Sequence, residues 1–110
     1  MCLVKKHWFP KIAWKPIKVY KYVNPYDNNV EFETPYMYKS YKFGEVIEAK
    51  CSWIKNFFKN EINGEGVHAY ARRMPDSYFA TIPKFSLYWE GEDDDIASTR
   101  LIVHNKKFIK

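Results

Sequence analysis

Two stretches of the chain alternate apolar and polar side chains with a period of two residues. The first is residues 17–21 (Ile-Lys-Val-Tyr-Lys), and the second, residues 47–53, carries apolar groups at every other position: Ile47, Ala49, Cys51 and Trp53. Successive side chains of a β-strand point to opposite faces of a sheet, so this pattern predicts two half-buried strands. We therefore expect one face of a sheet to form the interior of the protein and the other face to meet solvent.

Strand-like segments continue along the chain between turn-forming residues. Further strands are expected at 30–33, 67–71, 78–82, 85–90 and 99–104. The Asn63-Gly64 step predicts a hairpin or tight turn, and Pro83 must lie at an edge, a bulge or a bend. Aromatic residues, which favour strands, make up 19% of the chain. The predicted fold class is mainly β: a bent antiparallel or mixed sheet, or a small barrel, of five to seven strands with at most one short helix.

The length of 110 residues suits one domain with one core. Residues 1–16 contain Pro10 and Pro16, which favour extended geometry, so we expect an aromatic and basic N-terminal arm there. Large apolar groups in a free tail would reduce solubility, and this arm is therefore expected to dock on the domain. Residues 17–110 are expected to form a single β-rich globular domain.

Several classes of protein are disfavoured by the sequence. No apolar run reaches the length of about 20 residues that a membrane span needs, and the opening residues 1–7 lack the apolar stretch that is typical of a secretory signal. Cys2 and Cys51 are too few for a disulfide framework, which indicates a cytoplasmic protein with free thiols. The Cys and His residues lack the paired spacing of a zinc site, and the acidic run at 90–95 is expected to be a solvated loop. We predict no metal site and no cofactor.

The net charge of +5 is unevenly distributed. Residues 1–60 hold eleven Lys against five acidic residues, and residues 61–110 hold seven basic against eight acidic residues. Lysines interleaved with aromatic residues could pair phosphate contacts with base stacking, which makes nucleic-acid binding by the basic aromatic first half one functional alternative. The same interleaving is also typical of the solvated face of a strand.

Five short blocks occur in an order that resembles a known group of proteins. They are Val19-Tyr20-Lys21, Tyr41-x-Phe43-Gly44-Glu45-Val46, Glu65-Gly66-Val67-His68-Ala69-Tyr70, Ile82-Pro83-Lys84-Phe85-Ser86-Leu87-Tyr88-Trp89-Glu90-Gly91 and Ile96-Ala97-Ser98-Thr99-Arg100-Leu101-Ile102-Val103. The chain thereby resembles small uncharacterised proteins of bacteriophages and of Bacteroides-type gut bacteria. The pattern of that family has Gly where Phe85 stands, and usually a helix between the Gly-x-His and Ile-Pro strands. The resemblance implies a phage-type or bacterial protein in the cytoplasm and carries no established activity.

The leading functional hypothesis is a non-enzymatic binding module for a host or virion protein. Its candidate contact residues are the aromatic side chains of the arm, two tyrosines of the following loop and a small basic patch: Trp8, Trp14, Tyr36, Tyr38, Arg72 and Arg73. Aromatic and arginine side chains are the groups that most often anchor protein interfaces.

An enzyme is the main alternative hypothesis. A His on a strand that leaves a glycine turn presents an imidazole for acid–base chemistry, which singles out His68. Together with Tyr20, Lys21 and Glu90 it has a layout similar to that of degenerate ADP-ribosyltransferase-like or other nucleotide-handling enzymes. We favour a structural role over a catalytic one, in which His68 is hydrogen-bonded to a neighbouring strand.

Overall fold

The structure is a computed structural model that describes residues 2–7, 9–27, 30–34, 40–49, 61–63 and 66–108. Every regular element in these ranges is a β-strand, so the mainly-β prediction is confirmed. Within the same ranges, no helix has the length and apolar character needed to cross a membrane. The strands form three antiparallel sheets, and none of them closes into a barrel.

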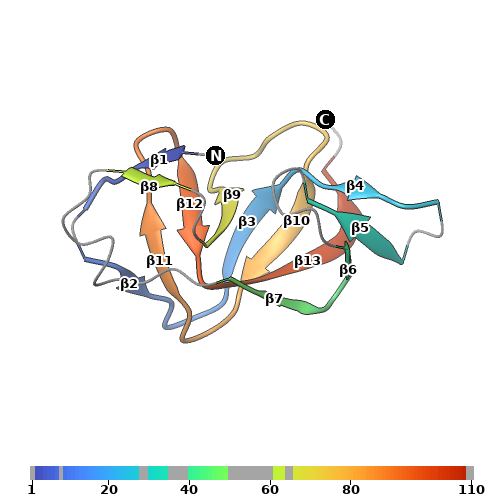
Figure 1. Ribbon diagram of the computed structural model, residues 1–110, viewed down its shortest axis with the longest axis horizontal. Helices are drawn as coiled ribbons and strands as arrows, with labels where there is room; N and C mark the ends of the chain where they lie inside the picture. The colour runs from blue at the N-terminus through green and yellow to red at the C-terminus, as the bar shows by residue number, and fades with distance from the viewer. Residues whose placement is uncertain are drawn as a thin grey trace.

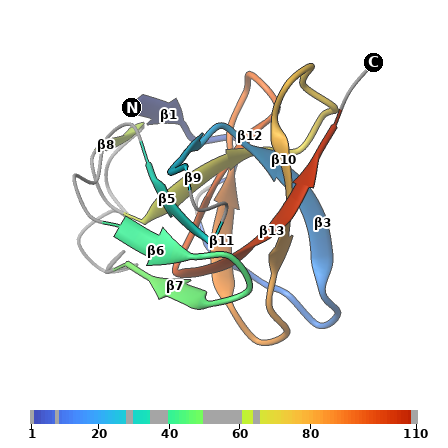
Figure 2. The same cartoon turned by 90° about the vertical axis from the view of Figure 1, so that its right-hand side faces the viewer.

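The largest sheet has eight strands and is strongly curved (Figures 1 and 2). In spatial order its strands are β2 (Lys11–Ile12), β11 (Leu87–Glu90), β12 (Asp95–Ser98), β9 (Val67–Tyr70), β3 (Ile17–Lys21), β10 (Tyr78–Ile82), β13 (Arg100–Lys107) and β7 (Val46–Glu48). The first alternating stretch is β3, near the middle of this sheet, where it pairs with both β9 and β10. The second stretch begins as edge strand β7, and its residues 50–53 lie outside the described ranges.

Two smaller sheets complete the fold. One pairs β1 (Cys2–Val4) with β8 (Glu61–Asn63), and the other joins β4 (Asn24–Pro25), β5 (Glu31–Glu33) and β6 (Ser40–Lys42). The predicted strand at 30–33 corresponds to β5. The two small sheets lie toward opposite ends of the molecule (Figure 1).

Each small sheet belongs to a different hydrophobic cluster. Leu3 of β1 and Ile62 of β8 are buried with Trp89 and Ala97 of the large sheet. Phe32 of β5 belongs to the main cluster, which also contains these buried residues of the large sheet: Val19, Ile47, Val67, Ala69, Ala80, Ile82, Ile96, Leu101 and Val103. Strand alternation explains the division, because Trp89 and Ala97 face one side of the sheet while Ala69 and Ile96 face the other.

Three details differ from the sequence-based expectations. The large sheet has eight strands where five to seven were predicted, because the short strand β2 comes from the arm and β12 comes from the acidic segment. The hairpin that the Asn63-Gly64 step could have formed is absent between β8 and β9, since β8 pairs with β1 and β9 pairs with β12 and β3. The alternative of a tight turn falls on Gly64, which lies outside the described residues. Asp95, expected in a solvated loop, is buried at the start of β12.

Candidate functional site

Four large apolar side chains are exposed on the arm and on the turn that joins β10 to β11. They are Phe9, Ile12, Trp14 and Phe85, with exposed fractions of 62%, 42%, 69% and 60%. We call the part formed by Trp14 and Phe85 the Trp14–Phe85 surface. The two rings meet edge to face with centroids 6.3 Å apart, a geometry that aromatic pairs favour.

The arm is held to the large sheet by backbone hydrogen bonds. β2 pairs with β11, the Ala13 amide donates to the Ser86 carbonyl over 2.9 Å, and the Phe85 amide donates to the Ala13 carbonyl over 2.6 Å. Ala13 is buried between them. Because neighbouring side chains of an extended chain point in opposite directions, burial of Ala13 directs Trp14 toward solvent.

Phe85 has a backbone conformation that bulky residues rarely adopt. Its φ angle is +69°, in the left-handed region where an L side chain costs about 1–2 kcal/mol. Glycine adopts this region without that cost. Phe85 therefore carries strain in the backbone while more than half of its side chain remains in water.

One lysine ammonium lies over a ring of this pair. The Lys84 ammonium lies 4.9 Å from the centroid of Phe85, and Lys15, next to Trp14, is exposed. Arg100 holds the turn from behind: its Nη2 donates to the Lys84 carbonyl over 2.9 Å, and its Nε donates to Ser86 Oγ over 3.2 Å. Phe85 is thus displayed on a fixed turn with the Lys84 ammonium beside its ring.

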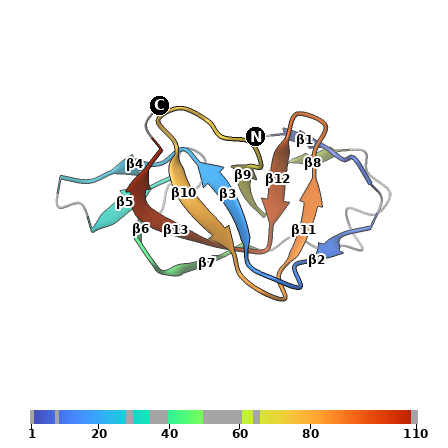
Figure 3. The ribbon, with the colours of Figure 1, turned by 180° about the vertical axis from the view of Figure 1, so that it is seen from behind.

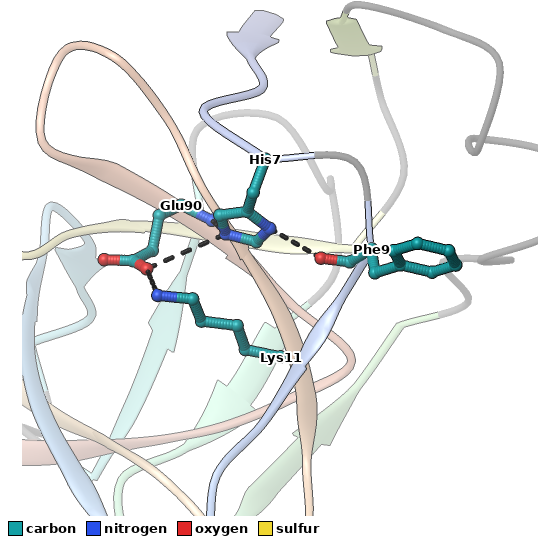
Figure 4. A network of polar contacts seen from close by, with 4 residues as sticks. All are labelled: His7, Phe9, Lys11 and Glu90. Carbon is teal, nitrogen blue, oxygen red and sulfur yellow. Dashed lines mark hydrogen bonds and ion pairs between the residues drawn. The ribbon is translucent and has the colours of Figure 1, made fainter.

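A second polar cluster fastens the start of the arm to β11 (Figure 4). Lys11 Nζ donates a hydrogen bond to Glu90 Oε1, and His7 Nε2 accepts one from the Glu90 amide over 3.1 Å. The other ring nitrogen of His7 donates to the Phe9 carbonyl. A carbonyl can only accept, so this arrangement requires the neutral His7 tautomer with its proton on Nδ1.

Lys11 and Glu90 each stabilise the charged form of the other. The hydrogen bond from Lys11 is the main cause that lowers the pKa of Glu90, and the same bond is the main cause that raises the pKa of Lys11. Glu90 is therefore ionised at neutral pH and is occupied in holding the arm. We call the contacts of Glu90 with Lys11 and His7 the Glu90 clasp, and its geometry indicates a structural role.

The four catalytic candidates lie in different places. Lys21 Nζ donates to the backbone carbonyl of His68, so the structure brings these two residues together. Tyr20 precedes Lys21 in β3 and points to the opposite face, where its ring centroid lies 5.4 Å from that of Phe79. Lys21 is 8% exposed, and burial lowers the pKa of its amine to about 8.

Glu90 is separated from His68 by the sheet itself. His68 of β9 pairs with Ala97 of β12, and Ala97 pairs with Trp89 of β11, so these three side chains share one face of the sheet. Glu90 follows Trp89, so the side chains of His68 and Glu90 point to opposite faces. The described positions therefore supply no common reaction centre for His68, Tyr20, Lys21 and Glu90.

The remaining sequence-based candidates divide into two groups. Arg72 and Arg73 are exposed after β9, and the Arg73 guanidinium lies 6.0 Å from the ring centroid of Phe108. Trp8, Tyr36 and Tyr38 lie outside the described residues. Within the described ranges, no three His, Cys, Asp or Glu side chains gather in a way that would hold a metal ion.

Sequence reasoning did not identify Phe85 as a contact residue. It assigned Phe85 to a strand, whereas β11 begins at Leu87 and residues 84–85 form a turn. Pro83 was the available signal, because it predicts a bend or an edge directly before Lys84 and Phe85. Comparisons of the chain with protein families, with curated proteins and with solved structures give no match.

Proposed function

We propose that this protein is a non-enzymatic binding module that docks an acidic segment of a partner protein on the Trp14–Phe85 surface. The observation that carries the proposal is the exposed aromatic ring of Phe85 on a left-handed backbone position. Residues in such sparsely populated conformations cluster at functional sites, where the surrounding structure maintains the strain.

The fold itself gains little from this arrangement. Phe85 buries less than half of its side chain, and an edge-to-face aromatic pair contributes about 0.5–1.5 kcal/mol. That contribution is similar to the cost of the strained backbone, about 1–2 kcal/mol. A partner that covers both rings would supply the apolar burial that the free protein lacks.

The lysines favour a particular chemistry in the partner. The Lys84 ammonium lies beside the Phe85 ring, Lys15 is exposed and follows Trp14 in the sequence, and Lys11 is already paired with Glu90. An Asp or Glu of the partner would meet Lys84 or Lys15, while a large apolar side chain beside it would pack on the rings. The resemblance to bacteriophage proteins adds a host or virion protein as the source of this segment.

The test compares capture by matched variants. Immobilised protein is exposed to bacterial lysate, and the retained partner is identified and reduced to a synthetic peptide that contains its acidic segment. Trp14→Ala and Phe85→Gly are each expected to weaken binding of that peptide at least tenfold, since central aromatic anchors contribute about 2 kcal/mol or more. Tyr26→Ala is the control, because Tyr26 is an exposed aromatic residue in the loop between β4 and β5.

Charge reversal tests the chemistry of the peptide. Lys84→Glu is expected to weaken binding of the acidic peptide and to favour a peptide in which Lys replaces Asp and Glu. Equal binding by the wild type, Trp14→Ala and Phe85→Gly would refute the proposed surface. Binding that depends on Trp14 but prefers the lysine peptide would refute the acidic partner.

A further inference from the structure

A groove of about 340 Å³ runs across β3, β10 and β13, which lie side by side in Figure 3. Its lining consists of Pro16, Lys18, Phe79, Ala80, Thr81, His104 and Lys106. None of these described lining residues carries a carboxylate, and Lys18, His104 and Lys106 are exposed. The groove is therefore a basic depression with an aromatic ring in it.

Two lysines converge on that ring from different strands. The Lys18 ammonium lies 4.5 Å from the centroid of Phe79, and the Lys106 ammonium lies 5.4 Å from it. A phenyl face attracts cations, so the ring holds both lysines near the groove before any ligand binds. Both side chains are long and exposed, and a ligand with negative charge can draw them off the ring.

The aromatic and basic groups extend beyond the groove. The ring of Phe79 packs against Tyr20 and Phe108 with centroid distances of 5.4 and 6.0 Å. Arg73 lies over Phe108, so a third cation follows the two lysines along the same row of rings. Thr81 Oγ1 and His104 Nε2, 2.8 Å apart, add a polar pair within the groove.

We propose that this groove binds single-stranded nucleic acid, with one base stacked on Phe79 and the flanking phosphates on Lys18 and Lys106. Single-strand binding surfaces combine a positively charged groove with aromatic rings on which bases stack. Arg73 contacts a further phosphate beyond Phe108. The polar pair of Thr81 and His104 lies where it meets the edge of the stacked base or its sugar.

The experiment measures the anisotropy of a fluorescein-labelled oligothymidylate as the full chain is added, over a range of salt concentrations. Three phosphate contacts predict a slope of about −2 for the logarithm of affinity against the logarithm of salt, since each single-strand contact contributes about −0.7. Lys18→Ala and Lys106→Ala are each expected to make the slope less negative by about 0.7. Lys42→Ala removes an exposed lysine of β6 and is expected to change neither the slope nor the affinity at constant salt.

Stacking is tested separately from charge. Phe79→Leu keeps an apolar side chain in β10 and is expected to weaken binding at least fivefold with an unchanged salt slope. A poly-glutamate peptide of similar charge serves as the competing acidic polymer and is expected to displace the oligonucleotide poorly. Phe85→Gly is expected to retain oligonucleotide binding, which distinguishes a failure of this site from a failure of the Trp14–Phe85 surface.

Three results would overturn the proposal. The first is no change in anisotropy at low salt, and the second is a salt slope that is the same for Lys18→Ala, Lys106→Ala and the wild type. The third is displacement by poly-glutamate at the same charge concentration as unlabelled oligonucleotide, which would identify a general anion surface. If Phe79→Leu fails to fold, the slopes of the two lysine variants still decide the outcome.

Discussion

Replacement of Lys21 by Met should remove a pH-dependent cost from the folded state. The Lys21 amine is buried in β3, and its position lowers its pKa from 10.5 to about 8 because burial penalises the charged form. Each unit of pKa difference corresponds to about 1.4 kcal/mol. Burial of the ammonium at neutral pH therefore costs about 3 kcal/mol relative to the unfolded chain.

The direction of the pH dependence follows from the two pKa values. Between pH 8 and pH 10.5 the unfolded chain retains the proton that the folded protein has lost, so the free energy of unfolding rises with pH. Integration from pH 7 to about pH 9.5 gives a gain of about 2 kcal/mol for the wild type. Lys21→Met lacks this gain. The variant also loses the hydrogen bond to the His68 carbonyl, about 1–3 kcal/mol, which offsets much of its advantage at pH 7.

Urea denaturation of both proteins at pH 7 and at about pH 9.5 measures this effect. The free energy of unfolding of Lys21→Met minus that of the wild type is expected to fall by about 2 kcal/mol between the two pH values. Taking the difference cancels the titration of groups that the two proteins share. A difference that does not change with pH would refute the burial of a charged Lys21 amine.

Two further predictions concern the contacts that β11 and the turn after it make with the rest of the protein. Gly91→Ala is expected to lower the free energy of unfolding by about 1–3 kcal/mol in urea denaturation, because a Cβ there would overlap Asp95 Oδ1 and lie 2.8 Å from Leu3 Cγ; unchanged stability would contradict this close packing. Glu90→Gln removes the ion pair with Lys11, so hydrogen exchange at the Ala13 amide is expected to accelerate while the amides between β9 and β12 keep their protection. The free energy of unfolding of Glu90→Gln should change by less than about 1 kcal/mol, since the pair is partly exposed, and unaltered exchange at Ala13 would show that the clasp does not hold the arm.

The strands in the middle of the large sheet were predictable because their side chains alternate. β3, β9 and β10 all fall within predicted segments, although β3 buries the consecutive residues Val19, Tyr20 and Lys21, so its second face does not meet solvent as predicted. β9 and β10 bury residues at alternating positions, as at Val67 and Ala69 of β9. Here the local pattern and the tertiary environment agree. The same alternation explains why the start of the second predicted strand is confirmed as β7, where Ile47 is buried between two exposed neighbours.

Strands with no alternating pattern were missed. All four residues of β12 are buried, including Asp95, and β2 is two exposed residues held by backbone pairing with β11. A run of carboxylates normally indicates a segment exposed to solvent. Here the turn that begins at Gly91 brings Asp95 back to Gly91, whose amide donates a hydrogen bond to the Asp95 carbonyl. β2 pairs with β11 and β12 pairs with β9, and these partners are distant in sequence, so a local pattern does not contain them.

The candidate site was predictable only in part, because local sequence shows single residues but not their neighbours on other strands. The sequence identified Trp14 as an unusual aromatic residue in an extended arm, and the structure places its ring in solvent. Lys18 and Tyr20 belong to the basic aromatic first half that the sequence analysis considered for nucleic-acid binding, but their neighbours Phe79 and Lys106 come from β10 and β13. A groove assembled across strands has no contiguous signature in the sequence.

Two phenylalanines, Phe32 and Phe85, illustrate the difference between an aromatic residue that stabilises this fold and one that the fold exposes. Phe32 is fully buried in the main cluster, with its ring 4.8 Å from that of Phe43, and contributes packing that truncation would remove at a cost of about 3–5 kcal/mol. Phe85 has the same side chain, yet it stands at a φ of +69° with most of its ring exposed, where glycine would fold with less strain. The stability of the chain gains little from a phenylalanine under those conditions, whereas the proposed function assigns it to an interaction with another molecule. Phe85→Gly distinguishes the two explanations directly, because it should leave the free energy of unfolding within about 1 kcal/mol of the wild type while weakening partner binding.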